Sequence, residues 1–161
     1  MQTLGQYPMK RMRRMRHDDF SRRLMRENVL TANDLILPVF VKEGERDREA
    51  IPTMPGVVRY TVDELVAECE KMVELGIPMV ALFPHIEDNL KTPDGIEAAN
   101  PDGLIPRTVK AIKAACPDLG IMCDVALDPY TTHGQDGLID ETGYILNDET
   151  IEMLVKQAMA Q

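Results

Sequence analysis

The sequence has no tryptophan, and aromatic residues make up only 4% of its 161 positions. Its three cysteines, Cys69, Cys116 and Cys123, form no CxxC pair. An odd number of scattered cysteines favours reduced thiols over a disulfide framework and gives no structural zinc site. No apolar run approaches the roughly 20 residues of a membrane-spanning helix, and the N-terminus lacks a signal-peptide core. These features predict a globular cytoplasmic protein that does not contact a membrane.

The net charge of −9 is unevenly distributed along the chain. Residues 10–26 hold eight basic residues against Asp18 and Asp19, a net charge of +6, so the other residues carry −15. A basic segment on an acidic body favours docking on the acidic surface of another subunit over a solvated tail. Nucleic acid is the weakest of the three readings, because aromatics are too few for a stacking platform. We therefore predict that residues 1–34 form a basic arm.

Three continuous apolar runs follow the arm at a regular spacing. They occupy residues 35–41, 79–84 and 121–127, with starts 44 and 42 residues apart. Such runs are typical of strands buried on both faces. Helical patterns separate them, and this alternation implies right-handed crossovers and a parallel sheet.

The helix starts are marked by recognisable residues. Thr61 and Glu64 fit a capping box, Pro106 is a favoured first helical residue, and a last helix starts after Asn147 or Asp148. The predicted inner face of the second helix is Val109, Ile112 and Cys116, and that of the third is Ile151, Leu154, Val155, Ala158 and Met159.

The pattern fits α/β folds of two kinds, a (β/α)8 barrel and a doubly wound sheet. No GxGxxG motif or P-loop follows any strand, which weakens the nucleotide-binding version. Eight units of this period need roughly 340 residues, within the size range of barrels. We therefore expect residues 35–161 to form a partial barrel of about three β/α units, and the chain to be truncated.

Three carboxylates cluster after the third run. Asp124 and Asp128 share one face of a strand with Ala126, and Asp136 lies on a glycine-containing loop that can fold back. Converging carboxylates hold a cation, bind an ammonium group or shift each other's pKa. Turn chemistry is the alternative for Asp128 and Asp136, which precede Pro129 and Gly137. Asp124 in an apolar strand must be paired or functional, because burying a lone carboxylate is costly.

Two other side chains are weaker candidates. His133 beside a glycine is more typical of a loop hydrogen bond than of a metal ligand or base. Lys42 follows the first strand and could form a Schiff base, but Glu43 and Glu45 favour a solvated lysine.

The segment CDVALDPYTTHGQDG (123–137) with GYILND (143–148) resembles the metal-site loop of the porphobilinogen synthase family, also called 5-aminolevulinate dehydratases. Nearly all of the chain is covered by the resemblance. The supporting blocks are RMRRMR (11–16), DDFSRRL (18–24), LILPVFVKEG (35–44), IPTMPGVVRYTVDEL (51–65) and ALFPHI (81–86).

The resemblance implies a (β/α)8 barrel whose N-terminal arm embraces a neighbouring subunit, in homo-oligomers that are typically octamers. It implies an enzyme that condenses two 5-aminolevulinate molecules to porphobilinogen, with loss of two waters, in tetrapyrrole (heme) biosynthesis. The two Schiff-base lysines of the family match no position here, so we expect this chain alone to be inactive. The alternative is a non-catalytic half-barrel interaction protein that assembles through its basic arm.

The resemblance also assigns candidate site residues. Asp124 matches an active-site aspartate, while Ala126, Asp128 and Asp136 stand where zinc-dependent members have cysteines. Without thiolates, no catalytic zinc is expected. The chain resembles the aspartate-rich subgroup, which implies allosteric magnesium with ligands outside this chain, and Asp128 and Asp136 holding substrate ammonium or ordered water. The remaining hypothesis is an unrelated acidic α/β domain that binds a cation through Asp128 and Asp136.

Overall fold

The computed structural model describes residues 5–161, and the chain divides into two compact units, Met1–Thr31 and Ala32–Gln161. The division lies close to the boundary after residue 34 that the sequence predicts. Within the first unit, α1 (Arg14–His17) and α2 (Asp19–Leu24) are short helices. Ser21 is their single buried residue, and Phe20 and Leu24 are exposed.

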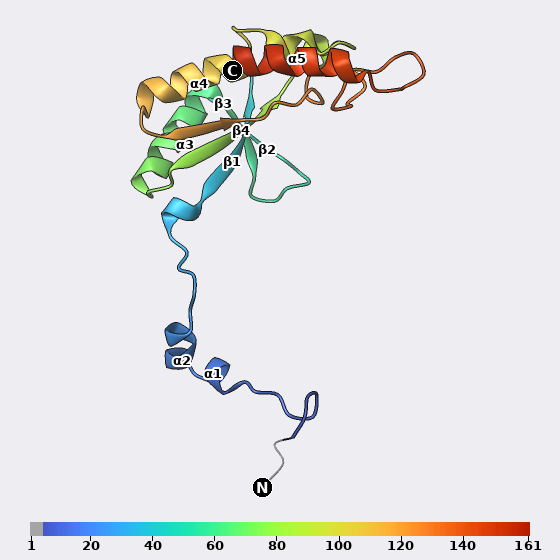
Figure 1. The fold of residues 1–161 in the computed structure, drawn as a ribbon. Helices are drawn as coiled ribbons and strands as arrows, with labels where there is room; N and C mark the ends of the chain where they lie inside the picture. Colours follow the sequence, from blue (N-terminus) through green and yellow to red (C-terminus); the bar gives the residue numbers. More distant parts are fainter. Residues whose placement is uncertain (1–4) are drawn as a thin grey trace. The chain divides into compact units, whose positions relative to one another are not determined.

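The second unit is built on a five-stranded sheet with the order β2-β3-β1-β4-β5 (Figure 1). Strands β1, β3, β4 and β5 are parallel, and β2 runs antiparallel to β3. The parallel sheet expected from the sequence is therefore present. The strands are β1 (Ile36–Lys42), β2 (Arg48–Ala50), β3 (Val58–Thr61), β4 (Met79–His85) and β5 (Gly120–Cys123).

Three longer helices and three short 3-10 helices complete this unit. The α-helices are α3 (Val62–Glu74), α4 (Leu104–Ala115) and α5 (Asn147–Ala160), and the 3-10 helices are η1 (Ala32–Asp34), η2 (Asp88–Leu90) and η3 (Ile96–Ala99). α3 packs on α4, both contact β1, and α5 packs on η3 (Figure 1). No helix within residues 5–161 is long and apolar enough to cross a bilayer.

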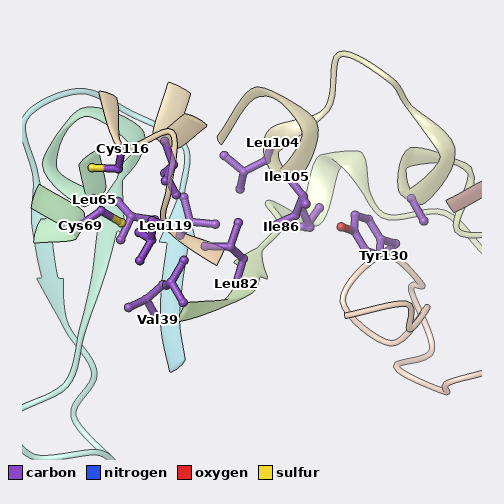
Figure 2. Packing of buried hydrophobic residues seen from close by; sticks show 14 of the residues in the cluster. Val39, Leu65, Cys69, Leu82, Ile86, Leu104, Ile105, Cys116, Leu119 and Tyr130 are labelled. Atoms are coloured by element: carbon purple, nitrogen blue, oxygen red, sulfur yellow. The ribbon is translucent and has the colours of Figure 1, made fainter. Parts of the chain in front are cut away.

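The hydrophobic core lies between the sheet and the helices that cover it. Figure 2 shows Val39 and Leu82 of the sheet facing Leu65 and Cys69 of α3. Strand β4 is buried on both faces as predicted, whereas β1 alternates between buried and exposed residues. The expectation of burial on both faces is therefore wrong for β1, because α3 and α4 pack on one side of it.

The predicted helix starts differ from the structure in detail. Thr61 precedes α3, but its side chain makes no capping hydrogen bond there. Its hydroxyl instead accepts from the Asp47 amide (3.1 Å) and donates to the Asp47 carbonyl (3.3 Å), which ties the start of α3 to the segment before β2. α4 begins at Leu104, before Pro106, and buries Ile112 and Cys116 as predicted.

The inner face predicted for α5 is wrong except at Leu154, which is partly buried against the core. Ile151, Val155 and Met159 are exposed, with Met159 at 83%. The buried face is instead formed by Thr150, Met153 and Gln157. Hydrogen bonds explain this difference. The side chains of Thr150 and Gln157 bond the backbone at Leu138 and Ala126, and these bonds turn the polar face of the helix inward in place of the apolar stripe.

Candidate active site at the carboxyl edge of the sheet

The carboxyl ends of the parallel strands meet at one edge of the sheet, where ligands bind in open and closed α/β sheets. The segments after β4 and β5 form a hollow of about 370 Å³ at this edge. Both signs of charge and several polar groups line it: Asp88, Lys91, Asp128, Thr131, Thr132, His133 and Gly134.

The structure corrects the third predicted strand. β5 ends at Cys123, so Asp124, Ala126 and Asp128 do not share a strand face, and Asp124 is exposed instead of buried among apolar residues. The chain leaves the sheet here because the carbonyl groups of Asp124 and Ala126 accept hydrogen bonds from the side chain of Gln157 in α5. Leu127 then turns fully into the core.

The two loops of the site are bound to each other. The Thr92 amide donates to the Tyr130 carbonyl (3.1 Å), and the Thr132 amide donates to the Thr92 carbonyl (3.2 Å). Thr92 and Thr131 thereby form a parallel bridge beyond the ends of β4 and β5. The loops therefore extend the parallel pairing of the sheet and hold the hollow open between them.

His133 is a loop hydrogen-bonder, in agreement with the sequence reading. Its Nδ1 accepts from the Gln135 amide (3.2 Å), and its Nε2 lies 3.1 Å from the Pro93 carbonyl. These contacts require the tautomer protonated at Nε2. Both ring nitrogens are engaged, so His133 positions the loop and has no free nitrogen for a metal.

Asp128 and Asp136 lie close enough for their charges to interact. Burial raises the pKa of the Asp128 carboxyl above its usual range, and the neighbouring charge of Asp136 raises it further, with a smaller effect from Asp124. A second carboxylate disfavours ionisation of the first, so the pair has an affinity for a proton or another cation. Asp136 and, to a smaller extent, Asp124 therefore act electrostatically on Asp128, which lines the hollow.

Replacing Asp136 with Asn should lower the pKa of Asp128 and raise the melting temperature at pH 7. A carboxyl whose folded pKa is raised contributes stability below its unfolded pKa of about 4, and that contribution is lost as pH rises through the folded value. The ionised pair is thus unfavourable at neutral pH, and the gain from Asp136→Asn should shrink as the pH is lowered to about 4. Thermal unfolding at both pH values measures it.

Asp140 is the matched control, because its pKa is shifted in the opposite direction to that of Asp128. Its carboxylate accepts from the Thr142 hydroxyl (2.7 Å) and from the Thr142 and Tyr144 amides, and these bonds lower its pKa. Asp140→Asn should therefore lower the melting temperature at pH 7. Equal changes in the two variants would contradict the repulsion between Asp128 and Asp136.

Lys42 is neither solvated, as the sequence favoured, nor free to react. Its side chain is 16% exposed, and its Nζ lies 2.5 Å from Asp47 and 2.8 Å from Glu49. These hydrogen bonds raise the pKa of the ammonium group. A nucleophilic lysine needs a lowered pKa, so this geometry disfavours a Schiff base at Lys42.

Sequence reasoning missed the groups around Lys42. Arg59 of β3 pairs with Glu49 of β2, and His85 ends β4 opposite Lys42 in the sheet. Burial lowers the pKa of His85, and the charge of Arg59 lowers it further. The short strand β2 carries no apolar period, so the one available signal was the density of charge in residues 42–49.

The carboxylates are the residues that could bind a cation. Within residues 5–161, however, no group of three or more His, Cys, Asp or Glu side chains is arranged to hold a metal ion. The Asp128–Asp136 pair fits a singly charged group that accepts few ligands, such as an ammonium, better than a fully coordinated divalent metal.

The fold and site define a parallel α/β protein of the TIM-barrel type with a carboxylate-lined site at the carboxyl edge of its sheet. Residues 9–161 match the family described as delta-aminolevulinic acid dehydratase. The chain belongs to this family.

Individual relatives agree. The delta-aminolevulinic acid dehydratase of Bradyrhizobium diazoefficiens is 51% identical over 151 residues, which cover 94% of this chain and 42% of the relative. The chloroplastic enzyme of Selaginella martensii is 47% identical, over 94% of this chain and 36% of its own. The crystal structure of the Toxoplasma gondii enzyme with porphobilinogen superposes with a TM-score of 0.87 at 42% identity, over 94% of this chain and 43% of that one. The chain thus spans less than half the length of these relatives.

Proposed function

We propose that this chain is the N-terminal part of a porphobilinogen synthase, the enzyme that condenses two 5-aminolevulinate molecules to porphobilinogen with loss of two waters. The coupled pair Asp128–Asp136, at the carboxyl edge of a sheet within the family match, is the observation that carries the proposal. Asp124, Asp128 and Asp136 are its substrate-side carboxylates.

The chemistry of the Asp128–Asp136 pair suits a substrate that carries an amino group, a keto group and a carboxylate, as 5-aminolevulinate does. The pKa of Asp128 is raised first by burial and then by the charge of Asp136, which supports a site that gains from a positive charge beside the two carboxylates. The ammonium group of 5-aminolevulinate supplies that charge and donates hydrogen bonds to both. Binding would therefore relieve the repulsion between Asp128 and Asp136 and orient the amino end of the substrate at the sheet edge.

The proposal places the protein in the aspartate-rich subgroup of the family. Aspartates at 128 and 136 supply hard oxygen ligands in place of thiolates, and alanine at 126 supplies no ligand, which supports a site without catalytic zinc. Magnesium acting allosterically, with ligands outside these residues, is part of the same proposal.

A homo-oligomeric assembly in the cytoplasm completes the proposal. The first unit exposes apolar side chains among its basic residues, including Met12 (83%) and Phe20 (66%), which supports burial against a partner. The acidic remainder of the chain offers a surface of complementary charge. A non-catalytic interaction protein would use the same arm, so the distinction rests on catalysis.

Incubation of this chain alone with 5-aminolevulinate and borohydride should give no stable lysine adduct. Lys42 is held between Asp47 and Glu49 with a raised pKa, so its neutral amine is scarce. Mass spectrometry of peptides measures the adduct. Formaldehyde with the same reductant is the control, because it should label exposed lysines such as Lys71. An adduct on Lys42 would contradict the prediction.

A chimera tests the proposed function directly. Residues 9–161 replace the matching segment of the Bradyrhizobium diazoefficiens enzyme, and porphobilinogen formation is measured with both parts in one chain. An active chimera supports the proposal, with the relative's C-terminal part alone as the inactive control. A chimera that folds and assembles but forms no porphobilinogen overturns it.

A further inference from the structure

We propose that Gln157 is a positioning residue that holds the segment carrying Asp124 and Asp128 in its binding geometry. This inference rests on the proposed function, since it assigns the positioning of the same carboxylates. Gln157 lies on α5, thirty-odd residues further along the chain, and its side chain bonds backbone carbonyls of the site and interacts with the side chain of Tyr130.

The side chain of Gln157 is completely buried and bonds the backbone just beyond β5. Its Nε2 donates to the Ala126 carbonyl (3.0 Å) and lies 3.4 Å from the Asp124 carbonyl. Gln161, one helical turn further on, also donates to the Asp124 carbonyl (3.2 Å). These carbonyls lie beyond the last paired residue of β5, Cys123, so the sheet no longer satisfies them. The amides of Gln157 in α5 and of Gln161 just after it replace the missing neighbouring strand.

The hydrogen bonds of the Gln157 side chain are made by its amide nitrogen and not by its oxygen. Gln157 Oε1 is buried and makes no hydrogen bond within the described residues. A leucine of similar volume would fill the same space without an unpaired acceptor. The polar side chain is therefore accounted for by the groups that its amide nitrogen reaches, the two carbonyl groups and Tyr130.

Fixing these carbonyls fixes the direction of the carboxylates. Two bonded carbonyls set the peptide planes from residue 124 to residue 127, and Leu127 is anchored in the core directly after them. The Cα–Cβ bonds of Asp124 and Asp128 then have defined directions. The position of Asp128 beside Asp136 therefore depends on this segment, together with the turn in which the Leu127 carbonyl accepts from the Tyr130 and Thr131 amides.

The test is a carbon-13 NMR titration of the aspartate carboxyls in the complete chain. In Gln157→Leu the segment loses its donors, Asp128 moves away from Asp136, and the pKa of Asp128 should fall by about half a unit or more, roughly a threefold rise in its dissociation constant. Met153→Ala is the matched control, because Met153 is buried on the same face of α5 and has no polar contact with the site. It should destabilise the chain and leave the Asp128 titration unchanged.

Two further variants keep the test decisive if Gln157→Leu does not fold. Gln157→Glu keeps the shape of the side chain. Its ionised carboxylate repels both carbonyl groups, whereas the protonated acid regains one hydrogen-bond donor. The carbon-13 signal of the Asp128 carboxyl should therefore return toward that of the unsubstituted chain at low pH. Gln161→Leu removes one bond and should give a smaller shift of the same sign. An Asp128 pKa that is unchanged in all three variants, or that shifts equally in Met153→Ala, overturns the inference. The titration needs no synthase activity, so this result is independent of the chimera.

Discussion

Leu127→Ala should lower the free energy of unfolding by about 2–5 kcal/mol. Leu127 is fully buried in the core cluster that also contains Tyr130 and Met153. Figure 2 shows Tyr130 at the end of this cluster furthest from the sheet residues Val39 and Leu82. Removing the Leu127 side chain leaves a cavity between the loop after β5 and α5. Urea unfolding followed by circular dichroism measures the loss.

Val125→Ala is the control for this prediction. Val125 lies two residues earlier in the same segment but is 42% exposed, so its truncation should cost no more than about 0.5 kcal/mol. Similar losses in the two variants would mean that Leu127 is not the anchor of the segment. The pair therefore separates burial from any general sensitivity of this loop.

The strands could be predicted where the apolar run coincides with backbone pairing. β1 and β4 pair over seven residues each, and both runs were recognised within one residue. The third run fails at Asp124, although its apolar pattern continues to Leu127. The pattern records that Leu127 is buried, but it does not distinguish burial in a strand from burial beneath a helix.

The candidate site shows the same limit. The aspartates are visible in the sequence as a local motif, and the structure brings Asp128 and Asp136 together. The partners of Lys42 were not predictable, because Asp47 and Glu49 reach it through the turn that leads to β2, a strand with no apolar signature. The adjacent Glu43 and Glu45 favoured solvation, whereas the structure places two other acidic residues, Asp47 and Glu49, on the amine.

The face of α5 is the clearest case of a polar contact overriding an apolar period. The stripe Ile151–Val155–Met159 has helical spacing, yet the helix buries Gln157. Unpaired carbonyls after β5 require donors, and an amide on the helix supplies them. Apolar spacing cannot predict this need for hydrogen-bond donors, since the carbonyl groups become unpaired only because β5 ends at Cys123.

Gly137→Ala should destabilise the second unit by about 1–3 kcal/mol and displace the neighbouring Asp136. A Cβ at Gly137 would lie 2.8 Å from Cγ2 of Ile145 and 3.1 Å from Oγ1 of Thr150. The Thr150 hydroxyl cannot move freely, because it accepts from the Leu138 amide (2.9 Å) and donates to the Leu146 carbonyl (2.6 Å). The added methyl group must therefore push the loop away from α5.

Gly134 provides the control in the same loop. Its φ of +69° is in the left-handed region, where asparagine is the best tolerated side chain, and no atom lies within 4 Å of an added Cβ. Gly134→Asn should therefore cost little, whereas Gly137→Asn should cost at least as much as Gly137→Ala. Thermal unfolding compares the variants, and the Asp128 titration reports the site. A displaced Asp136 should lower the Asp128 pKa in the Gly137 variants alone, because only at this glycine does an added Cβ meet Ile145 and Thr150. Equal destabilisation at both glycines would instead assign the effect to backbone conformation.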